Sequence, residues 1–367
     1  MRYRTIAGTD ISVSELGFGV WTVAAGWWGD YSDEQAVTLL RQGHERGINF
    51  FDTADTYGNG RGETILAEAF PGTERDKIVI ATKFGYDWES QIGKRREGHQ
   101  EAPHCFEPDF LQRALDGSLR RLGTDRIDLW QLHNVRMEHL ERDDVWSFLD
   151  RARREGKVRS VGAALGPAIG WREEGLYALA ERQVEVVHMI YNALELDPGR
   201  ELIAAARAAG RSLLVRVPHS SGMLEGKYTV DTVFDENDHR RHRPRAWLIN
   251  GLKKIEQLGF LTEATGGVLG QAALRYILKD PEVVSTLPNI YGLEQIEEFA
   301  AASDCDDVGP EVASRVEALY DSNYGLPVEQ EAAVTAAGRG SRCRPRLTPA
   351  PPRRPATTRG RGRRRTA

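Results

Sequence analysis

Eight short apolar runs alternate with longer amphipathic stretches over about 300 residues, and this rhythm constrains the fold more than any other feature. The amphipathic stretches have the spacing of helices, and the runs have the length of strands buried on both faces. Strands that alternate with helices form a parallel sheet, and eight of them are enough to close it. We therefore predict an α/β fold, a (β/α)8 TIM barrel, with strands at residues 14–21, 48–52, 78–83, 127–132, 158–163, 184–190, 212–217 and 283–287.

An open, doubly wound sheet is the competing arrangement of the same elements. Such a sheet usually carries the phosphate-binding sequence G-x-G-x-x-G at the first turn from strand to helix. Here the first strand ends GFGVWT at residues 17–22, so Thr22 stands at the third glycine position. The missing fingerprint favours the closed barrel.

The barrel pattern has clear flanking segments. Residues 3–15 alternate apolar and polar around the turn sequence GTD, which predicts an N-terminal β-hairpin. Two polar segments, 85–107 and 222–244, are expected to form long loops at the carboxyl-terminal rim. The pattern then gives way to Arg, Pro and Gly, so we expect a barrel domain over 1–325 and a disordered tail over 326–367.

The net charge of −5 over 367 residues conceals two parts of opposite sign. Residues 339–367 hold eleven arginines and no acidic residue, so the other 38 basic residues face 54 acidic ones and the body carries −16. An acidic body argues against a nucleic-acid partner. The tail could bind an anionic partner, but arginines without a single lysine favour a compositional bias with no role in the chemistry.

Other classes of function are disfavoured by the distribution of ligating and apolar residues. Three widely spaced cysteines make neither a disulfide framework nor a zinc site. His239 and His242 have no third ligand at fixed spacing, so a charged loop is favoured and no metal is expected. No apolar run reaches the roughly 18 residues that span a bilayer, and no signal peptide is visible. The sequence predicts a cytoplasmic protein without a membrane partner.

Four polar side chains stand at the ends of three consecutive predicted strands. Asp52 ends the second strand and Tyr57 follows it, Lys83 ends the third, and His133 follows the fourth. Because barrel sites form at the carboxyl ends of strands, these residues are expected at one rim. A buried Asp–Lys pair capped by a tyrosine can be purely structural, but the four groups together favour proton transfer.

The chemistry of such a set is specific. Asp52 holds Lys83 charged and oriented, and the Lys83 ammonium stabilises the anionic form of Tyr57. Tyr57 then donates a proton to a carbonyl oxygen while hydride reaches the carbonyl carbon, or both transfers run in reverse. His133 hydrogen-bonds the same oxygen and fixes its direction.

At these positions the chain resembles a known family. The sequences GINFFDTADTYG at 47–58, TK at 82–83 and LH at 132–133 resemble the aldo-keto reductase superfamily, above all its bacterial branch related to potassium-channel β-subunits. The resemblance covers roughly residues 1–320 and implies a (β/α)8 barrel that binds NADP(H) across its carboxyl rim. The catalytic residues that it implies are Asp52, Tyr57, Lys83 and His133.

The resemblance also implies which residues contact the cofactor. Arg216 stands where an aromatic residue often stacks on the nicotinamide, and a planar guanidinium could stack there instead. Backbone amides after Pro218, with Lys227, meet the pyrophosphate, while Gln295 and Glu298 belong to the adenosine end. The full implied set is Gly19, Trp21, Asp52, Ala164, His188, Arg216, Val217, Pro218, His219, Ser220, Gly222, Lys227, Asn289, Gln295 and Glu298.

A largely aromatic substrate pocket is implied in the same way, although ordinary loop packing explains each loop aromatic equally well. Its residues are Trp21, Trp27, Trp28, Tyr57, Phe84, Tyr86, Trp88 and His133.

The sequence departs from the family pattern at three places. Ala164-Leu165 replaces the Ser-Asn pair that usually grips the nicotinamide carboxamide, and His188 replaces a glutamine. Residues 289–293 hold no cation for a 2′-phosphate, and Phe299 replaces an asparagine. A phosphate without such partners loses its charge-assisted hydrogen bonds. NADP(H) stays favoured on family grounds, and NAD(H) stays possible.

The sequence therefore predicts NAD(P)H-dependent reduction of an aldehyde or ketone to an alcohol, or the reverse, with a small-molecule carbonyl or alcohol as partner. A nucleotide-binding redox sensor with slow turnover is the alternative. A lyase that uses Lys83 as a Schiff-base nucleophile is a third hypothesis, disfavoured because Asp52 keeps Lys83 charged. The natural substrate and the oligomeric state stay open.

Overall fold

Eight parallel strands form a closed barrel in the computed structural model, which describes residues 1–26, 29–93, 101–235 and 238–327. Neighbouring strands follow the order of the sequence. A parallel bridge between Leu16 and Thr286 closes the ring between its first and last strands. The strands are β3 (Phe18–Gly19), β4 (Phe50–Asp52), β5 (Val79–Phe84), β6 (Ile127–His133), β7 (Val158–Ala164), β8 (Val186–Ile190), β9 (Ser212–Arg216) and β10 (Val283–Leu287).

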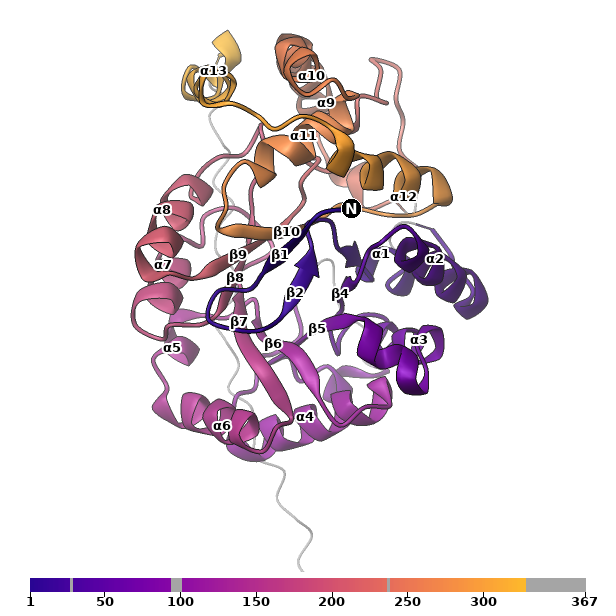
Figure 1. Cartoon of the computed structure of the whole chain (residues 1–367), viewed down its shortest axis with the longest axis vertical. Helices are drawn as coiled ribbons and strands as arrows, with labels where there is room; N and C mark the ends of the chain where they lie inside the picture. The colour runs from indigo at the N-terminus through magenta and orange to yellow at the C-terminus, as the bar shows by residue number, and fades with distance from the viewer. Residues whose placement is uncertain (27–28, 94–100, 236–237, 328–367) are drawn as a thin grey trace, which may run out of the picture.

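Helices surround the strands, as Figure 1 shows. Those that connect successive strands are α2 (Asp33–Glu45), α3 (Arg61–Ala69), α4 (Pro108–Leu122), α6 (Asp143–Arg154), α7 (Arg172–Ala180), α8 (Gly199–Ala209) and α11 (Leu269–Leu278). Additional helices are α1 (Trp21–Ala24), α5 (Met137–Leu140), α9 (Arg245–Ile255), α10 (Gly259–Thr265), α12 (Leu293–Ala300) and α13 (Pro310–Asp321).

The predicted barrel and hairpin are confirmed, and each predicted run overlaps one barrel strand. The first run differs most, because only Phe18–Gly19 of residues 14–21 is strand. Val20 already has the helical angles φ −66° and ψ −18°, so Trp21 opens the short helix α1 instead of ending the strand. The predicted tail from residue 328 onward lies outside the described residues.

Local signals set several helix ends. Ser32 accepts a hydrogen bond from the Gln35 amide, and the Gln35 side chain accepts one from the Ser32 amide, which together cap α2. Pro108 starts α4, and Gly123 ends it with φ +61°, a conformation that side chains with a Cβ rarely adopt. These caps fix where the chain turns back toward the next strand.

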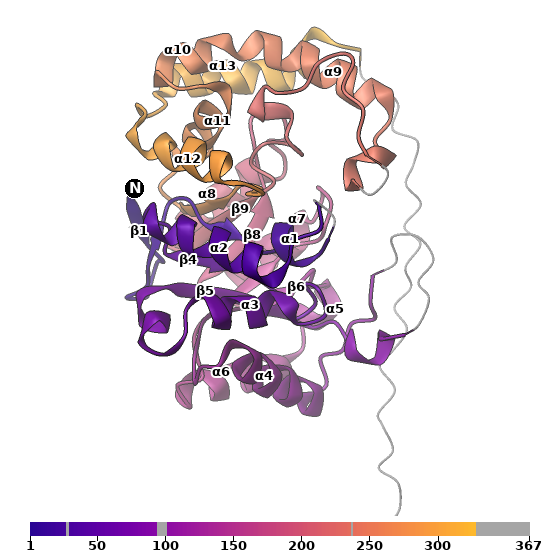
Figure 2. The same ribbon diagram turned by 90° about the vertical axis from the view of Figure 1, so that its right-hand side faces the viewer.

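The N-terminal hairpin seals one end of the barrel. Its strands β1 (Tyr3–Thr5) and β2 (Ser12–Ser14) pair antiparallel. Ile6, Ile11 and Val13 are buried in one cluster with inward-facing side chains of the barrel strands. Figure 2 shows β1 at the end of the barrel away from α5, which follows the carboxyl end of β6. The carboxyl end is therefore the end available for a site.

A buried ion pair fastens the start of the barrel to α11. Arg275 is 2% exposed, and its Nη1 donates to Glu15 Oε1 at 2.8 Å, while its Nη2 contacts Asp307. Arg4 of the hairpin lies 3.6 Å from the same Glu15 carboxylate and donates to the carbonyl oxygen of Leu278 in α11. Removing one member of such a pair leaves a buried charge with fewer partners.

We predict that Arg275→Met lowers the free energy of unfolding by about 3 kcal/mol, because Glu15 stays buried with Arg4 as its remaining cationic neighbour. Urea unfolding followed by far-UV circular dichroism measures this change. Arg172→Met is the matched control, because Arg172 pairs with Glu173 and Glu201 at the surface, where solvent screens the charges, and its loss should change stability far less. Equal losses in both variants would contradict the structural role of Arg275.

Candidate active site

Three neighbouring strands bring Asp52, Lys83 and His133 to the carboxyl rim, and the turn after β4 adds Tyr57. Asp52 ends β4, Lys83 is the penultimate residue of β5, and His133 ends β6. The Lys83 ammonium donates to Asp52 Oδ1 at 2.5 Å, to the carbonyl oxygen of Thr53 at 2.8 Å and to the Tyr57 hydroxyl at 3.1 Å. The structure thus brings the four residues together at one rim.

The electrostatics of the site keep Lys83 charged. The side chain is 0% exposed, and burial alone lowers the pKa of its ammonium. The charges of Asp52 and Tyr57 act in the opposite sense and outweigh burial, so the pKa of Lys83 lies above its ordinary value. A charged ammonium stabilises an oxyanion on Tyr57 and is a poor nucleophile.

Gln131 is a site residue that the sequence analysis missed. Its side-chain amide donates to Asp52 Oδ2 at 3.0 Å, so both oxygens of the carboxylate have a donor. Gln131 lies two residues before His133 on β6, and alternate strand residues point to the same side. That spacing is the signal that could have identified it.

His133 faces Tyr57 as a neutral imidazole. The two rings lie edge to face with centroids 5.9 Å apart. Burial, then the charges of Lys83 and Arg216, hold the pKa of His133 well below its ordinary value of 6.5. Its buried Nδ1 has no protein hydrogen-bond partner. A neutral imidazole can donate one hydrogen bond to a substrate oxygen without adding charge.

The predicted aromatic pocket is only partly assembled from the predicted residues. Tyr86 and Trp88 are buried together at the start of the loop after β5, and the Tyr86 ring lies 5.0 Å from that of His133. Phe84 stacks on Trp130 at 3.8 Å in the layer between strands and helices. Lys83 points inward, so its neighbour Phe84 points outward, and the structure does not bring Phe84 to the pocket.

The other predicted pocket residues lie in the segment after β3. Trp21 is half-buried at the start of α1, within reach of the rim because it follows the end of β3. Trp27 and Trp28 lie outside the described residues. The arrangement of the pocket wall therefore rests on Trp21, Tyr86 and Trp88.

The loop after β5 is anchored at its base. The backbone amide of Asp87 donates to the carbonyl oxygen of Pro103 at 2.8 Å, and that of Cys105 donates to the carbonyl oxygen of Gly85 at 2.7 Å. His104 stacks on Tyr86 at 4.2 Å, and its Nε2 donates to the carbonyl oxygen of His133 at 3.0 Å. These contacts tie the predicted pocket residue Tyr86 to the end of β6, where His133 lies.

The turn after β9 has the backbone shape of an anion-binding nest. Val217, Ser220, Ser221 and Gly222 have φ values of 56°, 46°, 57° and 90°. The backbone N–H groups of Ser221 and Gly222 donate to no protein acceptor in the described part of the chain. Successive free amides in such a turn bind phosphate oxygens.

Arg243 adds a cation to this nest, and the sequence analysis missed it. The Nη2 of Arg243 donates to Ser221 Oγ at 3.2 Å, and its buried Nε has no hydrogen-bond partner in the described part of the chain. No carboxylate among the described residues pairs with Arg243. The predicted cation Lys227 is instead taken by Glu298 at 3.0 Å. A sequence alone does not show which of two nearby cations is already paired.

Two buried side chains on β8 and β9, His188 and Arg216, have nitrogen atoms without hydrogen-bond partners in the described part of the chain. Ala164 ends β7, and His188 is 1% exposed with no hydrogen bond to either ring nitrogen. Burial and the charge of Lys83 hold the pKa of His188 well below its ordinary value. Arg216 donates to the carbonyl oxygen of Leu165 at 2.7 Å and also to Gly166, while its buried Nε has no partner.

The segment from β10 to α12 lies beside the turn after β9. Tyr291 donates to Glu225 Oε2 at 3.1 Å, and burial raises the pKa of that carboxyl. Gln295 is buried and Asn289 half-buried in the same segment. His219 donates through Nε2 to the carbonyl oxygen of Gly270 at 2.9 Å and packs on Phe299, the residue that replaces the family's asparagine.

A closed parallel barrel with an Asp–Lys–Tyr–His set at its carboxyl rim defines a class of oxidoreductases that act on carbonyl groups. The family model "Aldo/keto reductase family" matches residues 15–321, and the chain belongs to this family. The family acts on carbonyl compounds with a nicotinamide cofactor.

Two relatives whose names specify different cofactors match most of the chain. An NADH-specific methylglyoxal reductase of Escherichia coli is 28% identical over 310 residues, 82% of this chain and 93% of that protein. The aldo-keto reductase yakc [NADP(+)] of Schizosaccharomyces pombe is 29% identical over 294 residues, 78% of this chain and 83% of that protein.

A solved structure shares the fold. The glycerol dehydrogenase AKR11B4 of Gluconobacter oxydans superposes with a TM-score of 0.72 at 22% identity, covering 89% of this chain and 98% of that one.

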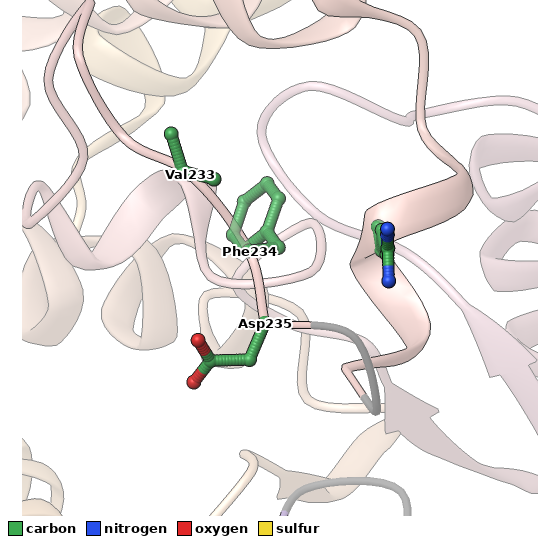
Figure 3. Close-up of a pocket in the computed structure, with 4 residues that line it drawn as sticks. Val233, Phe234 and Asp235 are labelled. Atoms are coloured by element: carbon green, nitrogen blue, oxygen red, sulfur yellow. The ribbon is translucent and has the colours of Figure 1, made fainter.

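Neither a membrane-spanning helix nor a cluster of metal ligands occurs among the described residues. No described helix has the length and apolar content needed to cross a membrane. No group of three or more ligating side chains in the described ranges could hold a metal ion, and the side chains of His239 and His242 fall outside the described set. A surface hollow is lined by Val233, Phe234, Asp235 and Arg241, none of them a predicted site residue (Figure 3).

We predict that the free energy of unfolding depends on pH through His219. Burial lowers the pKa of His219 to about 4 in the folded chain, whereas the unfolded value is 6.5. The unfolded chain therefore takes up a proton between about pH 7 and pH 5 while the folded chain stays neutral there, so stability is lost as pH falls. This one group should cost about 1–2 kcal/mol between about pH 7 and pH 5.

His219→Gln isolates that contribution, because an amide can still donate to the carbonyl oxygen of Gly270. Urea unfolding of both proteins at a series of pH values gives the difference in stability, in which all other titrating groups cancel. The free energy of unfolding of the variant should rise relative to that of the wild type as the pH falls from about 7 to 5. A difference that stays constant with pH would show that His219 titrates alike in both states.

Proposed function

We propose that this protein reduces an aldehyde or ketone to an alcohol, or catalyses the reverse oxidation, with NADH or NADPH. The observation that carries the proposal is the position of the buried Lys83 ammonium, within hydrogen-bond distance of both Asp52 and the Tyr57 hydroxyl. This arrangement stabilises negative charge on a phenol oxygen that lies at the carboxyl rim of the barrel.

The residues beside the tetrad suit a nicotinamide nucleotide. His188 of β8, which lies beside Ala164 at the end of β7, and Arg216 at the end of β9 carry buried nitrogen atoms without hydrogen-bond partners in the described part of the chain. The nest at Ser221 and Gly222 and the guanidinium of Arg243 suit a pyrophosphate. When bound, the nucleotide supplies or accepts the hydride.

Each residue of the tetrad has a distinct task in this proposal. Tyr57 gives its proton to the carbonyl oxygen as hydride reaches the carbon, and Lys83 stabilises the phenolate that remains until solvent returns the proton. Neutral His133 donates a hydrogen bond to the same oxygen and fixes the substrate's orientation. Asp52, held by Gln131, keeps Lys83 charged and in place.

The choice between the two nucleotides is a finer question. Among the relatives, one is named as NADH-specific and another is named for NADP(+). The family resemblance favoured NADP(H), while the departures at residues 289–293 kept NAD(H) open. The contacts of Glu225 beside the turn after β9 favour NAD(H).

We predict that Tyr57→Phe reduces turnover about 10²- to 10⁴-fold while nucleotide binding changes little, because only the transferable proton is removed. Oxidation of NADH or NADPH by a panel of aldehydes and ketones, followed by absorbance, measures turnover, and fluorescence titration measures binding. Tyr3→Phe is the control, since the Tyr3 hydroxyl donates to the carbonyl oxygen of Gly47 at the far end of the barrel.

Two outcomes would contradict the proposal. Equal loss of binding and turnover in Tyr57→Phe would remove the acid role of this residue. A wild-type protein that binds the nucleotide but oxidises none of it with any carbonyl would favour the redox sensor.

The cytoplasmic location stays a prediction of the sequence. We also propose that residues 1–325 form the catalytic domain. Deleting residues 330–367 should then leave kcat/KM within about twofold of the full chain, because the charged residues that pair at the rim all precede the deletion. Steady-state kinetics of the two proteins test this, and a large loss would assign the tail a part in the site.

A further inference from the structure

We infer that Glu225 makes this nucleotide site select NAD(H) over NADP(H). The inference rests on the proposed function and names a residue that decides which cofactor is accepted. The two nucleotides differ only at the 2′ position of the adenosine ribose, where NADP(H) carries a phosphate and NAD(H) a hydroxyl.

The position of the adenosine follows from the two sites already described. The tetrad fixes the nicotinamide end at the barrel axis, and the nest at Ser221 and Gly222 fixes the pyrophosphate. The chain leaves the nest through the 3-10 turn Met223–Glu225 and meets the segment between β10 and α12. The adenosine ribose therefore comes to lie where Glu225 and Tyr291 meet.

Glu225 is fixed in this place by its neighbours. Glu225 is only 8% exposed, and its Oε2 accepts a hydrogen bond from the Tyr291 hydroxyl at 3.1 Å. Tyr31 donates to the Tyr291 backbone oxygen at 2.8 Å, which holds that segment against the rest of the rim. A carboxylate held in this way accepts a hydrogen bond from a ribose hydroxyl and repels a phosphate dianion.

The nearby cations do not offset this repulsion, because their charges are taken by other carboxylates. Lys227 pairs with Glu298 at 3.0 Å, and Arg46 pairs with Glu297 at 2.8 Å. Arg240 is neutralised by Asp238 and also contacts Tyr228. In the described part of this end of the site, a phosphate would therefore meet Glu225 without a free cation to balance it.

Arg243 differs from these cations because it contacts the nest, and this contact assigns it to the pyrophosphate and not to a 2′-phosphate. Its guanidinium donates to Ser221 Oγ, within the nest itself. It therefore contributes to the pyrophosphate, which both nucleotides possess. Changes at Arg243 should weaken both nucleotides alike, whereas changes at Glu225 should alter only the ratio of their affinities.

Equilibrium titration of the protein's tryptophan fluorescence with NADH and with NADPH, at about pH 8 where carboxyl groups are ionised, tests the inference. The wild type should bind NADH at least about tenfold more tightly than NADPH. Glu225→Gln keeps the side-chain shape and removes the charge, so the NADPH affinity should rise about tenfold while NADH changes less than about threefold.

Three further variants make the result specific. Tyr291→Arg sets a guanidinium against Glu225 and should shift the ratio toward NADPH, which tests the same charge without altering Glu225. Arg243→Met should weaken both nucleotides by similar factors. Glu263→Gln removes one exposed charge from α10, away from the nest, and should leave both affinities unchanged.

The outcomes separate the inference from the proposed function. Wild-type protein that binds both nucleotides equally, or NADPH more tightly, overturns the inference and leaves the function standing. An unchanged ratio in Glu225→Gln, or a selective loss of NADPH in Arg243→Met, also overturns it. Wild-type protein that binds neither nucleotide overturns the function and the inference together.

Discussion

The buried pair of Lys83 and Asp52 is the interaction on which the rest of the rim depends. Burying two charges costs several kcal/mol per ion unless their remaining donors and acceptors are satisfied. Here the lysine has Thr53 and Tyr57 as further acceptors, and the carboxylate has Gln131 as a further donor. The ends of β4, β5 and β6 are thereby joined by one polar network.

This network also explains the protonation states around it. Burial, together with the charges of Lys83 and Arg216, holds the pKa values of His133 and His188 well below their ordinary value, so both imidazoles are neutral. Neutral rings can each offer one donor and one acceptor at the centre of the rim. A site built this way holds two buried cations, Lys83 paired with Asp52 next to Tyr57 and Arg216 at the end of β9. The imidazoles between them are neutral hydrogen-bonding groups.

Much of the fold and of the tetrad could be predicted from the sequence because both follow from the period of the strands. Runs such as residues 127–132 carry apolar side chains on both faces, which is typical of a parallel barrel strand, and their carboxyl ends locate Asp52, Lys83 and His133. The same period places Phe84 on the outer face, a consequence that the sequence analysis did not draw. Gln131 could have been found by the same rule.

The cofactor contacts were harder to predict because they depend on which charges are paired in three dimensions. The sequence predicts Lys227 as a phosphate ligand, but in the structure its ammonium pairs with Glu298, 71 residues away in the chain. Arg243 lies in a polar segment without a recognisable motif, and only its contact with Ser221 gives it a role. Glu225 similarly gains its meaning from Tyr291. The nucleotide site is therefore divided between a nest that favours negative charge and a neighbouring carboxylate that opposes it, and this division lies in pairings that the sequence does not display.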